Sequence, residues 1–373
     1  MTSDGASTRR GSPPPRGRPG GTLAAVAAAV GVSRTTVSNA YNRPDQLSKD
    51  LRDRIMAAAE QLGYAGPDPV ARSLRTRQAD AVGLLFNESL GYAFRDPGAV
   101  EFMHGLGEAC SERGRSLLVI PAPPGARHAE TVLRAAVDGF IISSLSEPDE
   151  NIAAVLSRPQ PAVIVDAPLG LPGVDFVGID DRAGFAMVAE HVLALGHRQI
   201  GVISIRRGED LAAEPEPRPL SERMAAGRIQ HPVRHQRLLG LLGAAEARSV
   251  SLDGIWVTER PYNSREEGVA GAQALLAARP TLTAIICITD LLAFGVIDEL
   301  VHRGVSVPEQ ITVTGFDDVP ASESYGLTTV RQPLEEKGRR AIETLLDDRP
   351  RASAKRVMLP TSLTVRASSG PVR

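Results

Sequence analysis

Residues 33 to 42 carry short polar side chains and an arginine, which are types suited to holding nucleic acid. Arg34, Thr35 and Asn39 point outward from one predicted helix, where their donors and acceptors match base edges in the major groove. An arginine there binds guanine through O6 and N7, worth about 1–3 kcal/mol of discrimination. We predict that these three residues read bases. Hydroxyl and amide groups suited to phosphate oxygens lie nearby, at Thr22, Ser33, Thr36, Ser38, Asn42 and Ser48.

Three short helices are predicted to position these side chains. The apolar spacing predicts helices over 23–29, about 34–40 and 49–62, each preceded by a serine or threonine cap. Gly31 permits the turn between the first two, and Val37 faces inward. A three-helix bundle with a solvated polar face is the alternative. Because the caps, the glycine turn and the inward valine coincide, the pattern favours a helix-turn-helix DNA-binding module.

The distribution of charge supports this interpretation. The whole chain has a net charge of −2, which alone argues against a nucleic-acid partner. Residues 1–78, however, hold twelve Arg and Lys against six Asp and Glu, a balance of +6, whereas the remaining residues hold 30 against 38, a balance of −8. A basic N-terminal segment followed by an acidic remainder is typical of a DNA-contacting module joined to a separate domain.

From Ala81 onward the pattern changes to short apolar runs alternating with amphipathic helices. Such alternation predicts an α/β fold with parallel sheets covered on both faces, and about 290 residues favour two lobes rather than one core. The predicted strands are 82–86, 116–120, 139–143, 162–166, 176–180, 201–205, 283–288 and 311–316, with helices near 100–113, 128–136, 150–156, 182–195, 233–247, 265–278 and 291–302.

Eight motifs are spread over almost all of the chain after residue 21. They are GVSRTTVS (31–38), AAAEQLGY (57–64), VARSLR (70–75), AVGLLF (81–86), LALGHRQIGVI (193–203), ITDLLAFGVIDEL (288–300), VTGFDD (313–318) and LTTVRQPLEEKGRRA (327–341). In these motifs the chain resembles the LacI/GalR family of bacterial repressors. The resemblance implies a cytoplasmic transcriptional regulator with a hinge helix and a two-lobed, periplasmic-binding-protein-like effector domain. That domain would bind a small-molecule effector, a sugar or related metabolite, which changes operator affinity by allostery.

The resemblance also implies a homodimer on double-stranded DNA. Paired hinge helices would insert a leucine into the minor groove, and Leu74 occupies that position. Tetramers in the family use an additional C-terminal heptad helix, whereas this chain ends with the strand-like segment 355–366 and a polar tail without a heptad. We therefore expect a dimer and a near-palindromic operator.

For the effector, the resemblance transfers two residues. Arg237 matches a cleft arginine that grips sugar hydroxyls or carboxylates, and Asp290 matches a residue that bonds hydroxyls. The alternatives are a helix-surface arginine and a helix cap, and capping by Asp290 can coexist with binding. Tyr92, Phe94 and Asp96 follow the first strand, where either an aromatic lid with a polar contact or an ordinary loop is expected.

The predicted organisation has four parts. These are a disordered basic leader (1–21), the helix-turn-helix domain (22–66), a hinge (67–79) and the effector-binding and dimerisation domain (80–370). Arg16–Pro19 in the leader resembles an AT-hook, although we interpret it as flexible basic chain. The hinge departs from the family at Ala65-Gly66, which lengthens the join, and at Pro69. Residues 206–230 form an unusually long connection beside the expected cleft.

The sequence gives no support for an enzymatic activity, a bound cofactor or metal, or a membrane location. Catalytic motifs such as G-x-S-x-G, Walker A and H-E-x-x-H are absent, and Gly105-Leu106-Gly107 lies inside a helix pattern. His231 and His235 have metal-like spacing but no third ligand, so a solvated helix start is expected. Cys287 is interpreted as a buried small hydrophobe. A solute-binding protein for uptake would share the two-lobed fold, but residues 22–78 and the absent signal peptide oppose it. The missing catalytic set opposes a sugar-acting enzyme.

Overall fold

The computed structural model describes residues 21–66, 78–123, 125, 127–205, 216–225, 231–348 and 353–373. The chain divides into two compact units, Met1–Gln78 and Ala79–Arg373. The predicted leader up to residue 20, with its Arg16–Pro19 motif, lies outside the described residues. So do residues 67–77, which include Pro69 and Leu74.

The first unit is built from short helices around a small core. Val26, Val37 and Ile55, one from each α-helix, are fully buried, so the predicted apolar faces do meet. Gly31 has a φ of 74° and ends the first helix, as the turn requires. The elements are α1 (Leu23–Val30), α2 (Arg34–Asn42), the 3₁₀ turn η1 (Pro44–Gln46) and α3 (Lys49–Gln61).

The second unit begins with a lobe built on a six-stranded sheet in the order β12-β5-β4-β3-β1-β2, with every pairing parallel. We call it the first lobe. Its strands are β1 (Ala81–Phe86), β2 (Ser116–Pro121), β3 (Gly139–Ser143), β4 (Ala162–Val165), β5 (Asp175–Ile179) and β12 (Arg356–Leu359). Its helices are α5 (Leu90–Ala93), α6 (Pro97–Glu112), α7 (Ala129–Arg134), α8 (Glu150–Leu156) and α15 (Leu334–Leu345).

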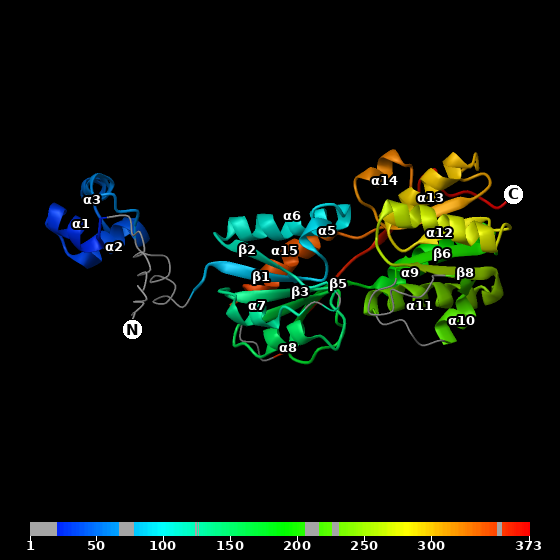
Figure 1. Ribbon diagram of the computed structural model, residues 1–373, viewed down its shortest axis with the longest axis horizontal. Coiled ribbons are helices and arrows are strands. Elements are labelled where there is room, and N and C mark those ends of the chain that lie inside the picture. The colour runs from blue at the N-terminus through cyan, green and yellow to red at the C-terminus, as the bar shows by residue number, and fades with distance from the viewer. Residues whose placement is uncertain are drawn as a thin grey trace, which may run out of the picture. The chain divides into compact units, whose positions relative to one another are not determined.

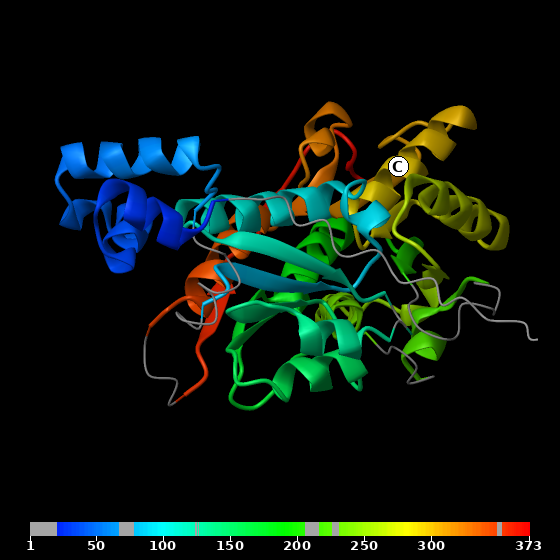
Figure 2. The ribbon, with the colours of Figure 1, turned by 60° about the vertical axis from the view of Figure 1, so that its left-hand side comes forward.

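Helices cover both faces of this sheet, which explains why its strands are apolar on both sides. One buried cluster joins the sheet to α6 and α15 and contains Phe102, Leu106 and Ile342. The other joins it to α7 and α8 and contains Val132 and Ile152. In Figure 2 the cyan helix α6 and the green helices α7 and α8 lie on opposite faces of the sheet.

The second lobe contains a seven-stranded sheet in the order β13-β11-β10-β9-β6-β8-β7. The inner pairings are parallel, and the edge strands β7 and β13 are antiparallel. Its strands are β6 (Ile200–Ile205), β7 (Arg218–Pro219), β8 (Ile255–Arg260), β9 (Ala284–Cys287), β10 (Thr312–Asp317), β11 (Thr328–Arg331) and β13 (Ser362–Thr364). Its helices are α9 (Asp181–Ala194), α10 (Leu220–Ala225), α11 (Pro232–Ala247), η3 (Leu252–Gly254), α12 (Arg265–Ala278), α13 (Asp290–His302) and α14 (Ala321–Ser324).

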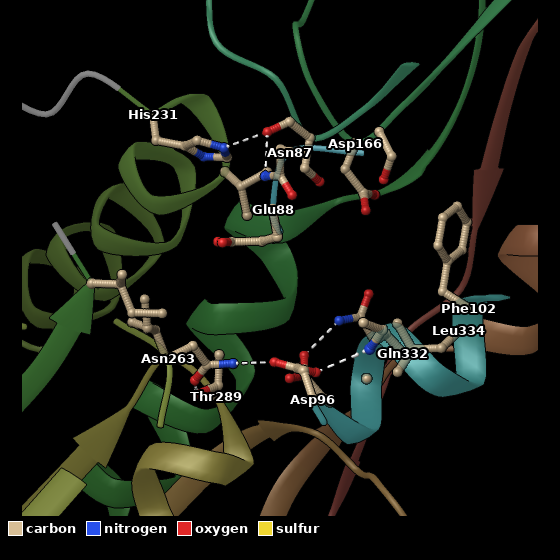
Figure 3. A pocket seen from close by; sticks show the side chains of 18 of the residues that line it. Asn87, Glu88, Asp96, Phe102, Asp166, His231, Asn263, Thr289, Gln332 and Leu334 are labelled. Carbon is tan, nitrogen blue, oxygen red and sulfur yellow. Dashed lines mark hydrogen bonds between the residues drawn. The ribbon is translucent and has the colours of Figure 1, made fainter. Parts of the chain in front are cut away.

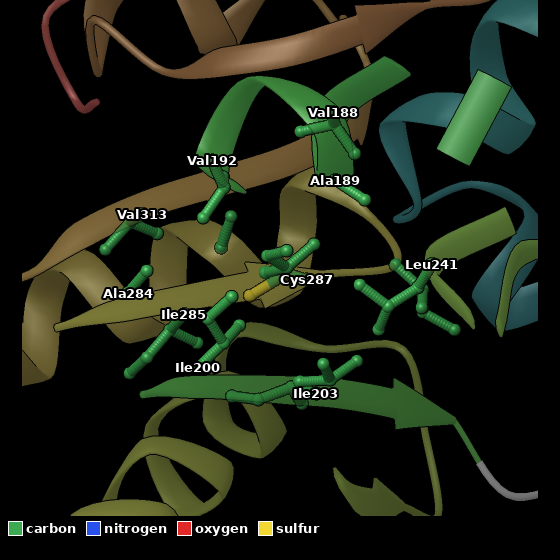
Figure 4. Close-up of a cluster of buried hydrophobic side chains, with 14 of the residues drawn as sticks. Val188, Ala189, Val192, Ile200, Ile203, Leu241, Ala284, Ile285, Cys287 and Val313 are labelled. Atoms are coloured by element: carbon green, nitrogen blue, oxygen red, sulfur yellow. The ribbon is translucent and has the colours of Figure 1, made fainter. Parts of the chain in front are cut away.

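Helices α12 and α13 lie on one side of the second sheet, with α9 and α11 on the other (Figure 1). The predicted two-lobed parallel α/β fold is thereby confirmed. Cys287 is fully buried among Val188, Ile200 and Leu241, as Figure 4 shows, so its prediction as a small core hydrophobe is confirmed. Among the described residues, no helix has both the length and the hydropathy needed to cross a bilayer.

The chain passes between the lobes three times. It crosses from β5 to α9, returns from β11 to α15, and crosses again from β12 to β13. Each lobe is therefore assembled from segments far apart in the sequence. The C-terminal tail continues this pattern, because buried Ser368 exchanges hydrogen bonds with the backbone of Val313 on β10 at 2.9 and 2.6 Å.

Candidate functional sites

The outer face of α2 carries the three residues predicted to read bases. Arg34 and Thr35 are exposed in its first turn, and Asn39 further along the helix is partly buried. Val37 on the same helix is fully buried and fixes which face is turned inward. The three predicted residues thus lie on one helix whose first turn is accessible, and base reading remains a prediction.

Three of the predicted phosphate contacts serve as helix caps. Thr22, Ser33 and Ser48 precede α1, α2 and α3, and each hydroxyl accepts a hydrogen bond from the backbone N–H three residues later, at 3.2, 3.0 and 3.4 Å. All three residues are exposed. Helix N-termini attract anions through their free N–H groups, so capping and phosphate contact are compatible here.

Within α2 the remaining predicted contacts bond to one another. The hydroxyls of Ser33 and Thr36 are 2.8 Å apart. The Asn42 amide donates to the carbonyl oxygen of Ser38 at 2.9 Å and to its hydroxyl at 3.2 Å. These bonds hold the polar side chains in place without DNA.

A cavity of about 190 Å³ lies between the two lobes of the second unit. Its walls come from the carboxyl ends of parallel strands, which is where open α/β sheets bind ligands. Phe86 and Ser143 end β1 and β3 of the first lobe, and Ile205 and Asp317 end β6 and β10 of the second. Figure 3 shows side chains from both sides converging on this space.

Arg237 lines the cavity and is held in place by the second lobe. Its Nε donates to Asp181 Oδ1 at 2.9 Å and its Nη1 to the carbonyl oxygen of Ile288 at 2.5 Å. The guanidinium carbon lies 3.7 Å from the ring centre of Phe316. The helix-surface alternative is therefore wrong, because only 6% of Arg237 is exposed. Arg237 presents a fixed cation to the cavity.

Two predicted effector residues do not line the cavity in this structure. Asp290 is fully buried, and its carboxylate accepts hydrogen bonds from Val319 N–H and from the hydroxyls of Ser322 and Thr329. This carboxylate holds a turn of its own lobe, which corrects the prediction of direct contact. Phe94 is 74% exposed and likewise lies outside the lining.

Tyr92 and Asp96 do line the cavity, as predicted. The Tyr92 hydroxyl donates to Asp96 Oδ2, and Asn263 of the second lobe donates to both oxygens, at 3.0 Å to Tyr92 and 2.6 Å to Asp96. Figure 3 shows Asn263 and Asp96 facing each other. Asn263 therefore joins the two lobes at the edge of the cavity.

His231 forms a second connection between the lobes. Its Nε2 lies 2.9 Å from the carbonyl oxygen of Ser144, which also accepts from the Asn87 amide at 2.7 Å. His231 is buried and lines the cavity, so the expected solvated helix start is wrong at this residue. In the part of the chain that the structure describes, no group of His, Cys, Asp and Glu is arranged to hold a metal.

A polar chain in the lining of the cavity crosses from one lobe to the other. Lys337 Nζ donates to Asp166 at 2.9 Å and to Gln332 Oε1 at 2.6 Å, and Gln332 Nε2 donates to Asp317 Oδ1 at 2.5 Å. Lys337 is 1% exposed, although it lies in an amphipathic helix with many charged neighbours. The sequence analysis predicted neither Lys337 nor Gln332 as a cavity residue. For Lys337, the scarcity of lysine in this arginine-rich chain was the available signal.

Burial raises the pKa of Asp317 well above its ordinary value of 3.8. Nearby Arg237 opposes this shift, whereas the charges of Asp290 and Asp96 reinforce it. Burial likewise raises the pKa of Asp181, against the attraction of Arg237. Burial thus acts against the charged form of both carboxyl groups.

Two family models match the chain. Residues 22–66 match the model described as bacterial regulatory proteins, lacI family, and residues 189–369 match a periplasmic binding protein-like domain. An HTH-type transcriptional regulator of Mycobacterium tuberculosis is 45% identical over 367 residues, which cover 96% of this chain and 99% of that protein.

Two solved structures have the same architecture. A complex of the transcriptional regulator CelR with cellobiose is 27% identical, with a TM-score of 0.66, and covers 93% of this chain and 99% of that one. The crystal structure of the lac repressor dimer bound to operator and the anti-inducer ONPF is 24% identical, with a TM-score of 0.76, and covers 94% and 99%. The latter likeness is one of fold alone.

Proposed function

The chain belongs to the LacI family of bacterial transcriptional regulators, and on that premise we propose that it is a repressor controlled by a small polar molecule bound between its lobes. The observation that carries the proposal is the cavity itself, lined by both lobes and bridged by Asn263 and His231. A molecule held by both walls binds the closed arrangement better than an open one, and that difference in affinity is what a regulator needs.

The charges in the cavity favour a neutral ligand. The lining contains the cations Arg234, Arg237 and Lys337. Arg237 is paired with Asp181 and Lys337 with Asp166, so the protein itself balances the charges of these two. Glu88 and Asp96 add acidic groups to the lining. These carboxylates would repel an anionic compound such as a sugar phosphate. The hydroxyl groups of a neutral sugar, by contrast, can donate to the carboxylates and accept from the cations, even where those groups are already paired.

The size of the cavity favours a small ligand. About 190 Å³ is below the roughly 300–1,000 Å³ of pockets that enclose drug-sized compounds. We propose a neutral sugar or related metabolite about the size of one ring, bound by Arg237, Tyr92 and Asp96 among others. The cellobiose bound by CelR is a precedent for a neutral sugar in this fold.

On DNA we propose a homodimer that binds a near-palindromic operator. The lac repressor binds its operator as a dimer, and one small helix-turn-helix unit offers too few contacts for specific binding. Arg34, Thr35 and Asn39 would read bases, and the capping residues Thr22 and Ser33 would hold phosphates. The minor-groove contact of Leu74 stays a prediction.

A selection experiment tests this function. The full chain is incubated with a random duplex library, and the recovered consensus is used as the operator in gel shifts with a panel of neutral monosaccharides, disaccharides and sugar phosphates. We expect a near-palindromic consensus, and a neutral monosaccharide or similar compound that shifts both operator affinity and the unfolding temperature. A chain that selects no consensus is not a sequence-specific regulator, and a response to sugar phosphates alone contradicts the neutral ligand.

A further inference from the structure

A group of charged residues lies at the far end of the first lobe from the cavity, where the second unit begins. Arg115 Nη1 donates to Asp80 Oδ1 at 2.7 Å and to Asp138 Oδ2 at 2.6 Å. The other oxygen of Asp138 accepts from the backbone N–H of Ala79 at 2.6 Å. We call Ala79, Asp80, Arg115 and Asp138 the entry clamp.

The backbone of the entry clamp is fixed as well. Asp80 has a φ of 53°, a left-handed conformation that non-glycine residues rarely adopt. Its carbonyl oxygen accepts from Ser116 N–H at 2.9 Å, and Asp138 N–H donates to the carbonyl oxygen of Ala81 at 2.8 Å. The chain therefore enters β1 in one defined direction, set by side chains from the starts of β2 and β3.

The entry clamp and the cavity lie at opposite ends of the same strands. β1 and β3 pair in parallel register from Val82 to Phe86, and six residues of strand span about 20 Å. At the cavity end, Asn87 follows β1 and donates to the Ser144 carbonyl oxygen after β3, the same oxygen that His231 of the second lobe contacts. A rigid pair of strands thus connects the bridge between the lobes to the entry clamp.

We propose that Arg115 is a positioning residue that transmits the state of the cavity to the DNA-binding unit by fixing the direction of the chain at Ala79. This proposal rests on the proposed function. Ala79 is the first residue of the second unit, so every mechanical influence along the chain between the units passes through it. Partly exposed ion pairs contribute little to stability, and the side chains of Arg115 and Asp80 are 21% and 40% exposed. We therefore expect the entry clamp to contribute more by fixing the direction of the chain than by stabilising the fold.

The variants follow from the bonding pattern. Arg115→Gln removes both ion pairs, and Asp80→Asn removes one while keeping a residue that tolerates positive φ. Arg115→Lys is the rescue variant, because both bonds come from a single nitrogen that an ammonium group can replace. Arg134→Gln is the matched control. It makes the same change of charge in the same lobe, at an exposed i, i+4 pair with Glu130 away from the entry clamp.

Each full-length variant is titrated against the duplex selected by the wild-type chain and against a scrambled duplex of equal length, and its thermal unfolding is recorded. For Arg115→Gln and Asp80→Asn we expect a loss of specific affinity of about tenfold, within the range of measured couplings between sites. Affinity for the scrambled duplex should remain unchanged, because it depends on the basic unit alone. Arg115→Lys and Arg134→Gln should behave like the wild type.

Unchanged specific affinity in both Arg115→Gln and Asp80→Asn would overturn the proposal, as would an equal loss on the scrambled duplex. If Arg115→Gln does not fold, the comparison between Asp80→Asn and Arg115→Lys decides, since Asp80 is the most exposed carboxylate of the entry clamp. A wild-type chain that selects no duplex would instead refute the proposed function and is thereby distinguishable.

Discussion

Asp317 and Asp318 follow one another at the end of β10 but have opposite electrostatic surroundings. Burial raises the pKa of Asp317, as described above. Burial also acts to raise the pKa of Asp318, but hydrogen bonds from Arg366 and Arg331 outweigh it and leave that pKa lowered. The first carboxyl faces the cavity, and the second is held by an arginine from β11 and another just after β13. Two neighbouring residues therefore make opposite contributions to the pH dependence of stability.

This difference predicts the behaviour of two matched variants. Because the folded protein raises the pKa of Asp317, stability from this residue is present below its ordinary value of 3.8 and is lost as pH rises through the raised value. The free energy of unfolding of the wild type should therefore fall relative to Asp317→Asn as the pH rises above 3.8 towards the raised pKa. Urea unfolding followed by the fluorescence of Trp256, the only tryptophan, measures this difference.

Asp318→Asn is the control. A lowered pKa gives stability that is lost only as pH falls below 3.8, so the wild type should exceed Asp318→Asn by a constant amount over the same range. If both variants show the same dependence on pH, the raised pKa of Asp317 is refuted.

Single residues of the cavity were only partly predictable. Arg237, Tyr92 and Asp96 line the cavity. Arg237 could be predicted from a family motif. Tyr92 and Asp96 could be predicted from their position after a strand, at the carboxyl edge of the sheet. Asp290 occupies such a position too, but its carboxylate turns into its own lobe and bonds to Ser322 and Thr329. Which way a side chain turns depends on partners distant in sequence, and sequence spacing carries no information about them.

At the scale of elements, the contact between α6 and α15 depends on two glycines. A Cβ at Gly105 would lie 1.9 Å from the carbonyl oxygen of Glu335, and a Cβ at Gly338 would lie 2.4 Å from that of Phe102. The helix backbones thus approach too closely for any side chain. The Gly105-Leu106-Gly107 motif, which is not a nucleotide loop, has a packing role.

Gly105→Ala should therefore destabilise the protein by about 1–3 kcal/mol, because α6 and α15 must separate to admit the methyl group. Gly107→Ala on the same helix is the control. A Cβ there meets nothing within 4 Å, so the substitution should stabilise by about 0.5–1 kcal/mol through helix propensity. Urea unfolding followed by circular dichroism measures both, and a Gly105→Ala variant as stable as Gly107→Ala would contradict the close approach.

Continuous apolar runs made most strands predictable, and amphipathic spacing did the same for most helices. The pattern missed several elements, and β8 and α15 show why. In β8 the apolar run covers only Ile255, Trp256 and Val257, because polar Thr258 and Glu259 follow. In α15 the buried apolar residues Ala341, Ile342 and Leu345 share their face with Lys337, Gly338 and Thr344, which interrupt the apolar pattern. Both elements are stabilised by neighbours from distant parts of the chain, α15 by α6 and β8 by β6.

For the molecule as a whole, the asymmetric charge predicts how binding responds to salt. Residues 1–78 carry a balance of +6, and DNA binding by such a unit releases counterions from phosphates. Affinity for the selected duplex should fall by roughly 10³-fold between about 50 mM and 200 mM salt, the lower end for six to ten phosphate contacts.

The small ligand is the internal comparison, because a neutral compound bound by hydrogen bonds displaces no counterions. Its affinity should change little over the same range of salt. Filter binding for DNA and calorimetry for the ligand give the two slopes. A DNA affinity that does not change with salt would contradict the prediction that residues 1–78 contact the phosphates.

The three passages between the lobes determine the order in which a growing chain can acquire its parts. The helices of residues 22–66 have their own core and emerge from the ribosome first. The first lobe lacks an edge strand until β12 has been made, and the second lobe lacks one until β13 and Ser368 follow. A message cut short anywhere between β1 and β12 therefore encodes the helix-turn-helix segment with neither lobe complete.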